Sequence, residues 1–216
     1  MPDEVQTILV IDDHPLMRKG ILQLIAMEST LRLVGEAGDG RRGLELAQQL
    51  RPDLILLDLN MQGLSGLDTL KALKATDLDA RVIILTVSDS EEDVVAALRF
   101  GADGYLLKDM EPEDVLRCLH AAAQGRIALG ERVAATLADA LRRDSQPKSL
   151  DSARLTERER EILELIATGY SNKVIARKLK ITEGTVKVHV KHLLHKLDLT
   201  SRVEAAVWAV KRGVRS

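Results

Sequence analysis

The segment DLILLDLN, residues 53–60, decides the fold, because it places Asp58 directly after four consecutive aliphatic residues. A short apolar run bounded by polar residues is typical of a strand that is buried on both faces of a sheet. Three further runs have this form: TILVIDD (residues 7–13), RVIILTVS (residues 81–88) and GYLLKD (residues 104–109). The sequence therefore predicts a sheet of buried, parallel strands.

Helical patterns separate these runs, so the first 124 residues alternate between strand and helix five times. Such alternation predicts an α/β fold, a five-stranded doubly wound parallel sheet with helices on both faces. Ser65 with Asp68, and Ser90 with Asp93, have the spacing of helix caps. We expect strands at residues 8–11, 32–36, 54–58, 82–86 and 105–107, and helices at residues 15–27 and 41–50 and after Ser65, Ser90 and Pro112.

Polar side chains follow the predicted strands at points that a parallel sheet brings together. The strand ends supply Asp12, Asp13, Asp58, Thr86 and Lys108. Because the carboxyl ends of parallel strands form the edge where ligands bind, we expect these residues around one crevice. Crowded carboxylates repel one another unless a cation joins them, and oxygen ligands suit Mg²⁺. The sequence therefore predicts a magnesium site in which Asp58 attacks a phosphoryl group that Lys108 and Thr86 contact.

The remainder of the chain differs from the sheet-forming region, and we expect a connection at residues 125–153 and a helical domain at residues 154–216. An amphipathic helix is predicted at residues 131–143. Residues 144–153 have the composition of a linker, which is either a hinge or an inert tether. In the last domain, a capping box at Thr156 and Glu159 precedes a short helix at 172–179, a tight turn at 180–182, a basic helix at 183–197 and a final helix capped by Ser201. This is the helix-turn-helix order.

The formal net charge of −2 conceals two oppositely charged regions. Residues 1–124 contain 12 Lys and Arg against 22 Asp and Glu, a net charge of −10, whereas residues 154–216 contain 14 against 7, a net charge of +7. A basic helical region suggests a nucleic-acid partner, although a chance division of charge is also open. No apolar run is long enough for a membrane span, no signal peptide is visible and Cys118 has no disulfide partner, so we expect a cytoplasmic protein with no membrane association.

The basic helix predicted at residues 183–197 has one apolar and one basic face when its residues are placed about 100° apart. The apolar face would pack on the core of its domain. The basic face and the turn before it supply the candidate DNA contacts Thr182, Thr185, Lys187, Val188, Lys191 and His192. Lysines would reach guanine edges or phosphates, the valine would meet a thymine methyl, and the hydroxyls would bind phosphate. An ordinary solvated lysine face is the alternative interpretation.

Two other patterns are better explained by structure than by binding. Glycines at positions 38, 40 and 43 satisfy the G-x-G-x-x-G spacing of dinucleotide-binding loops. They follow the second strand rather than the first, however, and an acidic crevice would repel a pyrophosphate. Three histidines of the basic helix recur every three residues, at positions 189, 192 and 195. That spacing spreads the rings around the helix, and no cysteine supports a metal site there.

Motifs in both regions resemble one family of regulators. The first region is similar to a response-regulator receiver domain in IDDHP (residues 11–15), ILLDLNM (55–61), LTVS (85–88) and GADGYLLKD (101–109). The last is similar to a LuxR-type helix-turn-helix domain in LTERERE (155–161), GYSNKVIARKL (169–179), TEGTVKVHVKHLLHKL (182–197) and SRVEAAVWA (201–209). Together they cover nearly the whole chain and resemble the NarL/FixJ family of two-component response regulators, with the nitrate/nitrite regulators of the NarL type as the nearest subgroup.

The resemblance implies a role for each residue of the crevice. Asp58 would be the phosphoacceptor. Mg²⁺ would be held by Asp13, Asp58 and the backbone carbonyl of Asn60, with Asp12 in support. Lys108 would contact the phosphate, and the switch pair would be Thr86 and Tyr105. One departure is visible, because Gln62 stands where many family members have proline, which would loosen the loop beside Asp58 and alter the lifetime of the phosphate.

These observations predict a phosphorylation-activated transcriptional regulator and not an enzyme. A sensor histidine kinase would phosphorylate Asp58, and the chain would then dimerise on double-stranded DNA, with RNA polymerase as a possible further partner. The resemblance implies that the unphosphorylated receiver masks the recognition helix, and the charge asymmetry offers a physical reason for this. Two alternatives remain open: a Mg²⁺-dependent phosphatase or phosphotransferase that uses Asp58, and a binding module whose C-terminal domain contacts protein rather than DNA.

Overall fold

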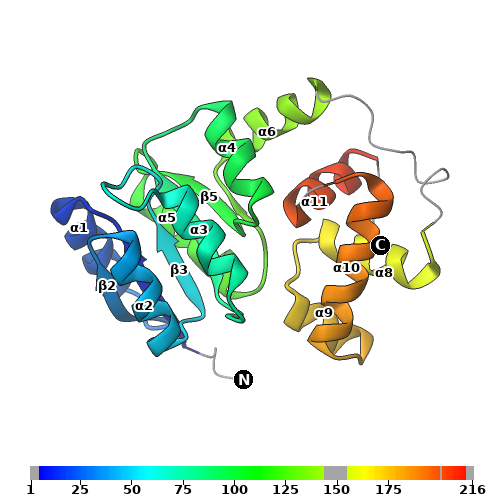
Figure 1. The fold of residues 1–216 in the computed structure, drawn as a ribbon, viewed down its shortest axis with the longest axis horizontal. Helices are drawn as coiled ribbons and strands as arrows, with labels where there is room; N and C mark the ends of the chain where they lie inside the picture. The colour runs from blue at the N-terminus through cyan, green and yellow to red at the C-terminus, as the bar shows by residue number, and fades with distance from the viewer. Residues whose placement is uncertain (1–4, 144–154, 200, 213–216) are drawn as a thin grey trace. The chain divides into compact units, whose positions relative to one another are not determined.

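The computed structural model describes residues 5–143, 155–199 and 201–212. These form two compact units (Figure 1). The first unit extends to residue 123 and includes residues 128–134, and the second contains residues 124–127 and the described chain from residue 135 onward. The linker predicted at residues 144–153 lies outside the described residues. The two units are considered separately below.

The first unit is a parallel sheet of six strands in the order β2-β1-β3-β4-β5-β6. Its strands are β1 (Gln6–Ile11), β2 (Leu31–Ala37), β3 (Leu54–Leu57), β4 (Arg81–Thr86), β5 (Gly104–Leu107) and β6 (Ala128–Leu129). The sequence predicted five strands, and the structure adds a sixth, β6, in a segment where only a connection was expected. Since β6 has two residues and pairs only with β5, at the edge of the sheet, it is too short to produce a recognisable hydrophobic pattern.

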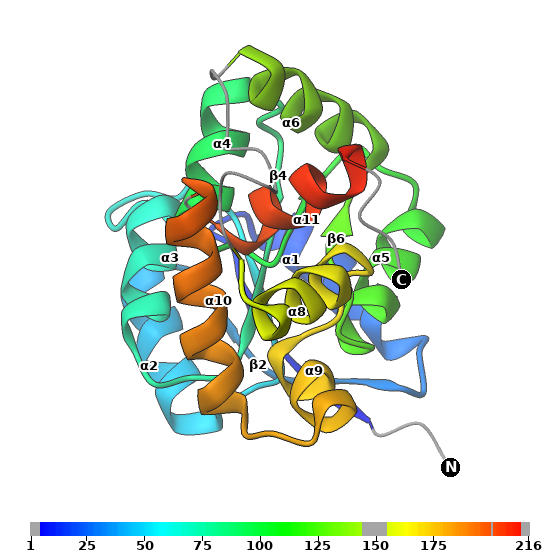
Figure 2. The same cartoon turned by 90° about the vertical axis from the view of Figure 1, so that its right-hand side faces the viewer.

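Five helices cover the two faces of this sheet: α1 (Pro15–Ala26), α2 (Gly40–Leu50), α3 (Gly66–Ala75), α4 (Glu91–Arg99) and α5 (Pro112–Ala123). Successive residues of a strand point to opposite faces. Ile8 and Val10 accordingly pack in one cluster with residues of α1 and α5. Ile11 instead lies against Gly43 of α2, and α2 and α3 lie side by side in both views (Figures 1 and 2). The doubly wound arrangement predicted from the sequence is confirmed.

Side-chain caps begin several helices where the sequence predicted them. The Ser65 hydroxyl accepts a hydrogen bond from the backbone N–H of Asp68, and Ser90 accepts one from Asp93. These bonds satisfy N–H groups that have no partner inside the helix. By contrast, α1 begins after His14 without a side-chain cap, and Pro15 sets its first turn.

The second unit is helical. Its principal helices are α8 (Glu157–Ala167), α9 (Asn172–Leu179), α10 (Glu183–Leu197) and α11 (Arg202–Lys211), and α6 (Glu131–Arg143) begins in the first unit and continues into the second. Aliphatic residues from α8 to α11 form its core together with Trp208. Within the part of the chain that the structure describes, no helix is both long and apolar enough to cross a membrane.

An ion pair between buried Glu159 and partly exposed Lys196 joins α8 to α10. The Thr156 hydroxyl accepts from the N–H of Glu159, and the Glu159 carboxylate accepts from the N–H of Thr156 at 2.8 Å, which completes the predicted capping box. The same carboxylate lies 2.6 Å from Nζ of Lys196 on α10. The start of α8 is therefore tied to the last turn of α10.

Candidate functional site

The ends of four strands supply the polar groups of one crevice, as the sequence predicted. Asp12 and Asp13 follow β1, Asp58 follows β3, Thr86 ends β4 and Lys108 follows β5. Since β3 lies between β1 and β4 in the sheet, Asp58 occupies the middle of this edge. Chain order reverses beside β1, which is the position where ligands bind in open parallel sheets.

Lys108 joins two carboxylates in the interior of the crevice. Its Nζ lies 2.7 Å from Asp58 Oδ2 and 2.8 Å from Asp12 Oδ2. All three side chains are at most 5% exposed, so little water screens their charges. With Asp13 beside them, three carboxylates face one ammonium group, and this excess of negative charge suits a cation.

Asp13 is the carboxylate best placed to accept such an ion. Its Oδ2 accepts a hydrogen bond from the backbone N–H of Gln62 at 2.9 Å. Its Oδ1 is buried and makes no hydrogen bond to the described residues, although the exposed ring of His14 brings Nδ1 to 2.9 Å from it. A buried carboxylate oxygen that makes no hydrogen bond is costly unless a cation or water satisfies it, so the donor set fits a hard divalent ion. Ligand atoms of Asp12, Asp13, His14 and Asp58 all lie within 4.8 Å of one another.

His14 is a member of this cluster that the sequence reasoning missed. Its Nδ1 lies 2.9 Å from Asp13 Oδ1 and 3.9 Å from Asp58 Oδ2, although the imidazole is 66% exposed. The pattern IDDHP contained the necessary information, since it places an imidazole directly after two carboxylates. The resemblance implies that the backbone carbonyl of Asn60 binds the cation. In the structure the backbone N–H of Asn60 donates to Asp58 Oδ1 at 3.2 Å.

Thr86 and Tyr105 are connected through one residue, Ser88. The Thr86 hydroxyl is buried. It accepts hydrogen bonds from the backbone N–H of Ser88 at 3.4 Å and from the side-chain amide of Asn60 at 3.5 Å. The Tyr105 hydroxyl donates to the carbonyl of Ser88 at 2.8 Å. Burial, and next the charge of Asp93, raise the pKa of Tyr105, so its hydroxyl stays protonated and remains a donor. Tyr105 is fully buried and points inward in this structure.

The second unit presents the predicted helix-turn-helix. α9 ends at Lys180, which has a left-handed backbone (φ 52°), and the chain then enters α10 through Thr182. The Thr182 hydroxyl accepts from the N–H of Thr185 and so caps α10. Threonine is among the residues with a short polar side chain that are favoured at the position before a helix.

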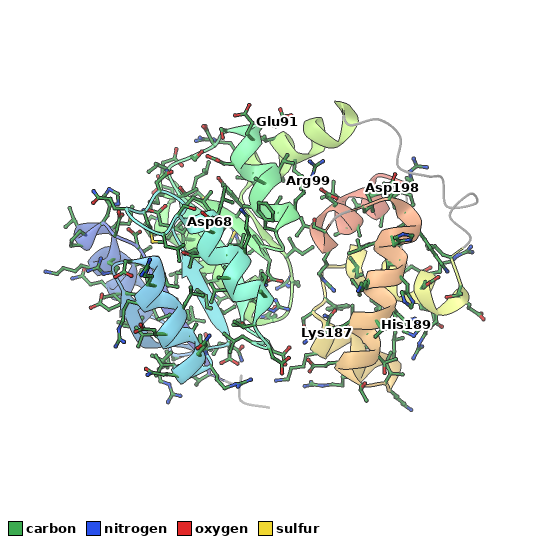
Figure 3. All side chains as sticks on the ribbon, viewed as in Figure 1. Asp68, Glu91, Arg99, Lys187, His189 and Asp198 are labelled. Atoms are coloured by element: carbon green, nitrogen blue, oxygen red, sulfur yellow. The ribbon has the colours of Figure 1, made fainter. Side chains whose placement is uncertain are left out.

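α10 has the two faces that its sequence predicted. Its apolar face is buried in the core of the unit and consists of Val186, Val190, Leu193 and Leu197. All six candidate DNA contacts are exposed: Thr182, Thr185, Lys187, Val188, Lys191 and His192. Lys187 and His189 leave the helix on different sides (Figure 3), and His189 is only half-exposed. Among the described residues, the histidines of α10 belong to no group of ligand atoms close enough together to hold a metal ion.

Two glycines of the G-x-G-x-x-G pattern, Gly40 and Gly43, serve packing. A Cβ at Gly40 would collide with Thr69 and Leu64, and one at Gly43 would collide with Ile11. The residue between the first two, Asp39, caps α2 by accepting the N–H of Arg42. Close contact between α2 and its neighbours therefore accounts for Gly40 and Gly43.

Comparison with known proteins assigns each of the two regions to a family of domains. Residues 8–120 match the response regulator receiver domain, and residues 153–209 match the bacterial regulatory proteins of the luxR family. The chain is 58% identical, over 95% of each chain, to the nitrate/nitrite response regulator protein NarL of Escherichia coli (strain K12). It is 48% identical to the nitrate/nitrite response regulator protein NarP of the same strain, over 93% of this chain and 92% of that protein.

A solved structure extends the similarity to the whole chain. The response regulator ChrA of a heme-sensing two-component system is 33% identical, with 97% of this chain and 98% of that chain covered and a TM-score of 0.53. The chain therefore belongs to the NarL type of LuxR-family response regulators, transcriptional regulators in which a phosphorylation-dependent receiver domain is joined to a helix-turn-helix DNA-binding domain.

Proposed function

We propose that a sensor histidine kinase phosphorylates Asp58 of this chain in response to nitrate or nitrite, the ions named for its NarL and NarP relatives. The observation that supports the phosphoacceptor role most directly is the 2.7 Å contact between Asp58 and Lys108 within an acidic crevice. In this proposal residues 1–124 are the receiver, residues 125–153 connect the domains and residues 154–216 bind DNA, in the cytoplasm.

The chemistry is a direct transfer from a phosphohistidine of the kinase. A carboxylate oxygen of Asp58 attacks the phosphorus, the new P–O bond forms as the P–N bond breaks, and the imidazole leaves with its electron pair and takes up a proton. Lys108, already beside Asp58, then pairs with the phosphoryl oxygens. No turnover of substrate follows, so the chain acts as a stoichiometric acceptor rather than as an enzyme.

Asp13 and Asp58, with the backbone carbonyl of Asn60 and with Asp12 in support, would hold Mg²⁺. When bound, the ion offsets the negative charge of the phosphoryl oxygens. The buried Oδ1 of Asp13, which makes no hydrogen bond to the described residues, supports this assignment, as does the excess of carboxylates over ammonium groups in the crevice.

The switch would act through the loop after β4. The Thr86 hydroxyl turns to the new phosphoryl oxygens and releases the N–H of Ser88, which it accepts in this structure. Ser88 also accepts the Tyr105 hydroxyl, so the position of that ring and of the loop change together. The altered surface would free α10 to bind double-stranded DNA as a homodimer, through Thr182, Thr185, Lys187, Val188, Lys191 and His192, and to place RNA polymerase at the promoter.

Phosphorylation can be tested with a small phosphodonor. Wild-type protein incubated with acetyl phosphate and Mg²⁺ should gain one phosphate per chain, measured by intact mass, whereas Asp58→Asn should gain none. Asp77→Asn, which removes an exposed carboxylate of the same unit, is the matched control and should behave as wild type. Repeated hydrolysis of the donor without accumulation of phosphoprotein would favour the phosphatase alternative instead.

DNA binding can be tested through its salt dependence. Lys191→Ala should weaken binding to promoter fragments and reduce the slope of log affinity against log salt by about 0.9, the value for one lost phosphate contact. Lys19→Ala removes an exposed lysine of the receiver and should leave the slope unchanged. If both variants bind as wild type does, the basic face of α10 is not the DNA contact. Failure of the wild type to bind any promoter fragment would favour the protein-binding alternative.

A further inference from the structure

The loop after β3 reaches the acidic crevice with its backbone. The N–H of Gln62 donates to Asp13 Oδ2 across 2.9 Å, although the two residues are 49 positions apart in the chain. The Gln62 residue itself is exposed, and the contact that the structure shows between it and the crevice is made by its backbone. The backbone is therefore the part of Gln62 that acts on the site.

This hydrogen bond determines how Asp13 is presented to a cation. Oδ2 accepts the N–H of Gln62, whereas Oδ1 is buried, makes no hydrogen bond to the described residues and has the exposed His14 ring 2.9 Å away. With one oxygen held in place, the other is oriented before an ion arrives. A hydrogen-bond donor that orients a metal-binding side chain in this way typically contributes a factor of about 10 to 100 in metal affinity.

Only a residue with a backbone N–H can make this contact, and proline has none. The family resemblance placed proline at this position in many members, and its absence was expected to loosen the loop. The hydrogen bond instead ties the loop to the residues that follow β1. Gly63 comes next with φ of 81°, a conformation that glycine adopts without strain, and so lets the chain turn after the tie.

We propose that the backbone N–H of Gln62 is a positioning group for the divalent cation. It holds Asp13 in the orientation that binds the ion, and it thereby lowers the cation concentration at which Asp58 is phosphorylated. Only the second of these effects rests on the proposed function of Asp58. The side chain of Gln62 has no part in either effect.

Two substitutions at one position separate backbone from side chain. Gln62→Pro removes the N–H, whereas Gln62→Ala keeps it. Mg²⁺ is titrated into the full chain by calorimetry without any phosphodonor. We expect the dissociation constant of Gln62→Pro to rise about tenfold and that of Gln62→Ala to equal the wild type. Wild-type affinity in Gln62→Pro, or equal weakening in both variants, would overturn the proposal.

The rate of phosphorylation distinguishes a positioning role from a general structural one. With acetyl phosphate as donor, Gln62→Pro should reach the wild-type rate at saturating Mg²⁺, with a half-saturating concentration about tenfold higher. A lower maximal rate with unchanged half-saturation would contradict the positioning role. If the wild type accepts no phosphate but Gln62→Pro still binds Mg²⁺ more weakly, the proposed function fails and the present inference stands.

A measurement on the folded wild type covers the case in which proline disturbs the loop. Hydrogen exchange read by NMR should show a slow amide at position 62 in the wild type and in Gln62→Ala. The same amide should exchange rapidly in Asp13→Ala, because its acceptor is gone. Equal exchange rates in wild type and Asp13→Ala would overturn the proposal without any proline variant.

Discussion

Lys108 contacts two buried carboxylates at once, and its removal would leave Asp12 and Asp58 facing each other without their counter-charge. We expect Lys108→Met to lower the free energy of unfolding by about 3–5 kcal/mol in a chelator, the usual cost of removing one partner of a buried ion pair. Urea denaturation followed by circular dichroism measures this loss.

A second substitution tests the cause of that loss. In the double variant Asp58→Asn/Lys108→Met one of the two charges is gone, so the loss should be smaller than in Lys108→Met alone. Simple addition of the two single effects would mean that repulsion between the carboxylates is not what Lys108 relieves. Added Mg²⁺ should also restore part of the stability of Lys108→Met, because an ion that binds only the folded state stabilises it.

Two glycines of the receiver should respond in opposite ways to alanine. A Cβ at Gly66 would collide with the backbone of Asp58 and Leu59, so Gly66→Ala should cost about 1–3 kcal/mol or more and disturb the phosphoacceptor. Gly20 lies inside α1 with nothing within 4 Å of its Cβ position, and Gly20→Ala should stabilise by about 0.5–1 kcal/mol. Thermal unfolding of both variants checks the pair, and equal effects would refute the packing argument.

The gathering of Asp12, Asp13, Asp58 and Lys108 could be predicted from the sequence because strand ends are visible in it and a parallel sheet aligns them. The backbone contact from Gln62 could not, since a main-chain N–H leaves no mark in a sequence and only the loop conformation aims it. His14 is an intermediate case. The sequence shows that it follows two carboxylates, but whether its ring turns toward them depends on the start of α1.

At the scale of elements, the ion pair between Glu159 and Lys196 connects α8 to α10. The lowered pKa of Glu159 makes the stability that this pair contributes dependent on pH. Burial acts to raise the pKa of Glu159, but the hydrogen bond from Lys196 and those at Thr156 outweigh it and lower the pKa below its ordinary value. A carboxyl with a lowered folded pKa contributes stability above its unfolded pKa, about 4.3, and loses it as pH falls through the folded pKa. The second unit should therefore lose stability on acidification through this region.

Trp208, the single tryptophan of the chain, is buried in the second unit, so its fluorescence reports the unfolding of that unit. Urea midpoints of the wild type should fall between about pH 5 and about pH 3. Lys196→Met should flatten this dependence because it removes the main group that lowers the Glu159 pKa. Lys173→Met, an exposed lysine on α9, should keep it. Parallel curves for wild type and Lys196→Met would refute the assignment.

Helix starts were the most predictable elements because their caps are local. Ser65, Ser90 and Thr156 each accept the N–H three residues later, as their spacing indicated, and Ser201 caps α11 as predicted. Ser171 caps α9 in the same way. The edge strand β6 was not predictable, since its pairing with Gly104 and Tyr105 depends on a partner 24 positions away. Local chemistry determines a cap, whereas a two-residue strand exists only through its neighbour.

For the whole molecule, the division of charge is the property with the widest consequence. The region up to residue 124 has a net charge of −10 and the region from residue 154 has a net charge of +7. The two regions therefore carry opposite charges, and the acidic region has the same sign of charge as DNA. Both regions have cores of their own. On these charges we expect the acidic receiver to compete with DNA phosphates for the basic domain, and competition of this kind weakens as salt screens it.

The last prediction follows from that competition. The isolated fragment 154–216 should bind promoter DNA more tightly than the unphosphorylated full chain, and phosphorylation of Asp58 should remove most of the difference. A swing from 1:99 to 99:1 in the masked population needs about 5.5 kcal/mol, so a partial shift would already be measurable as a change in affinity. Fluorescence anisotropy at several salt concentrations measures this, with Asp58→Asn expected to stay weak in the presence of phosphodonor. Equal affinity of fragment and unphosphorylated chain would eliminate masking, and control would then have to act through dimerisation alone.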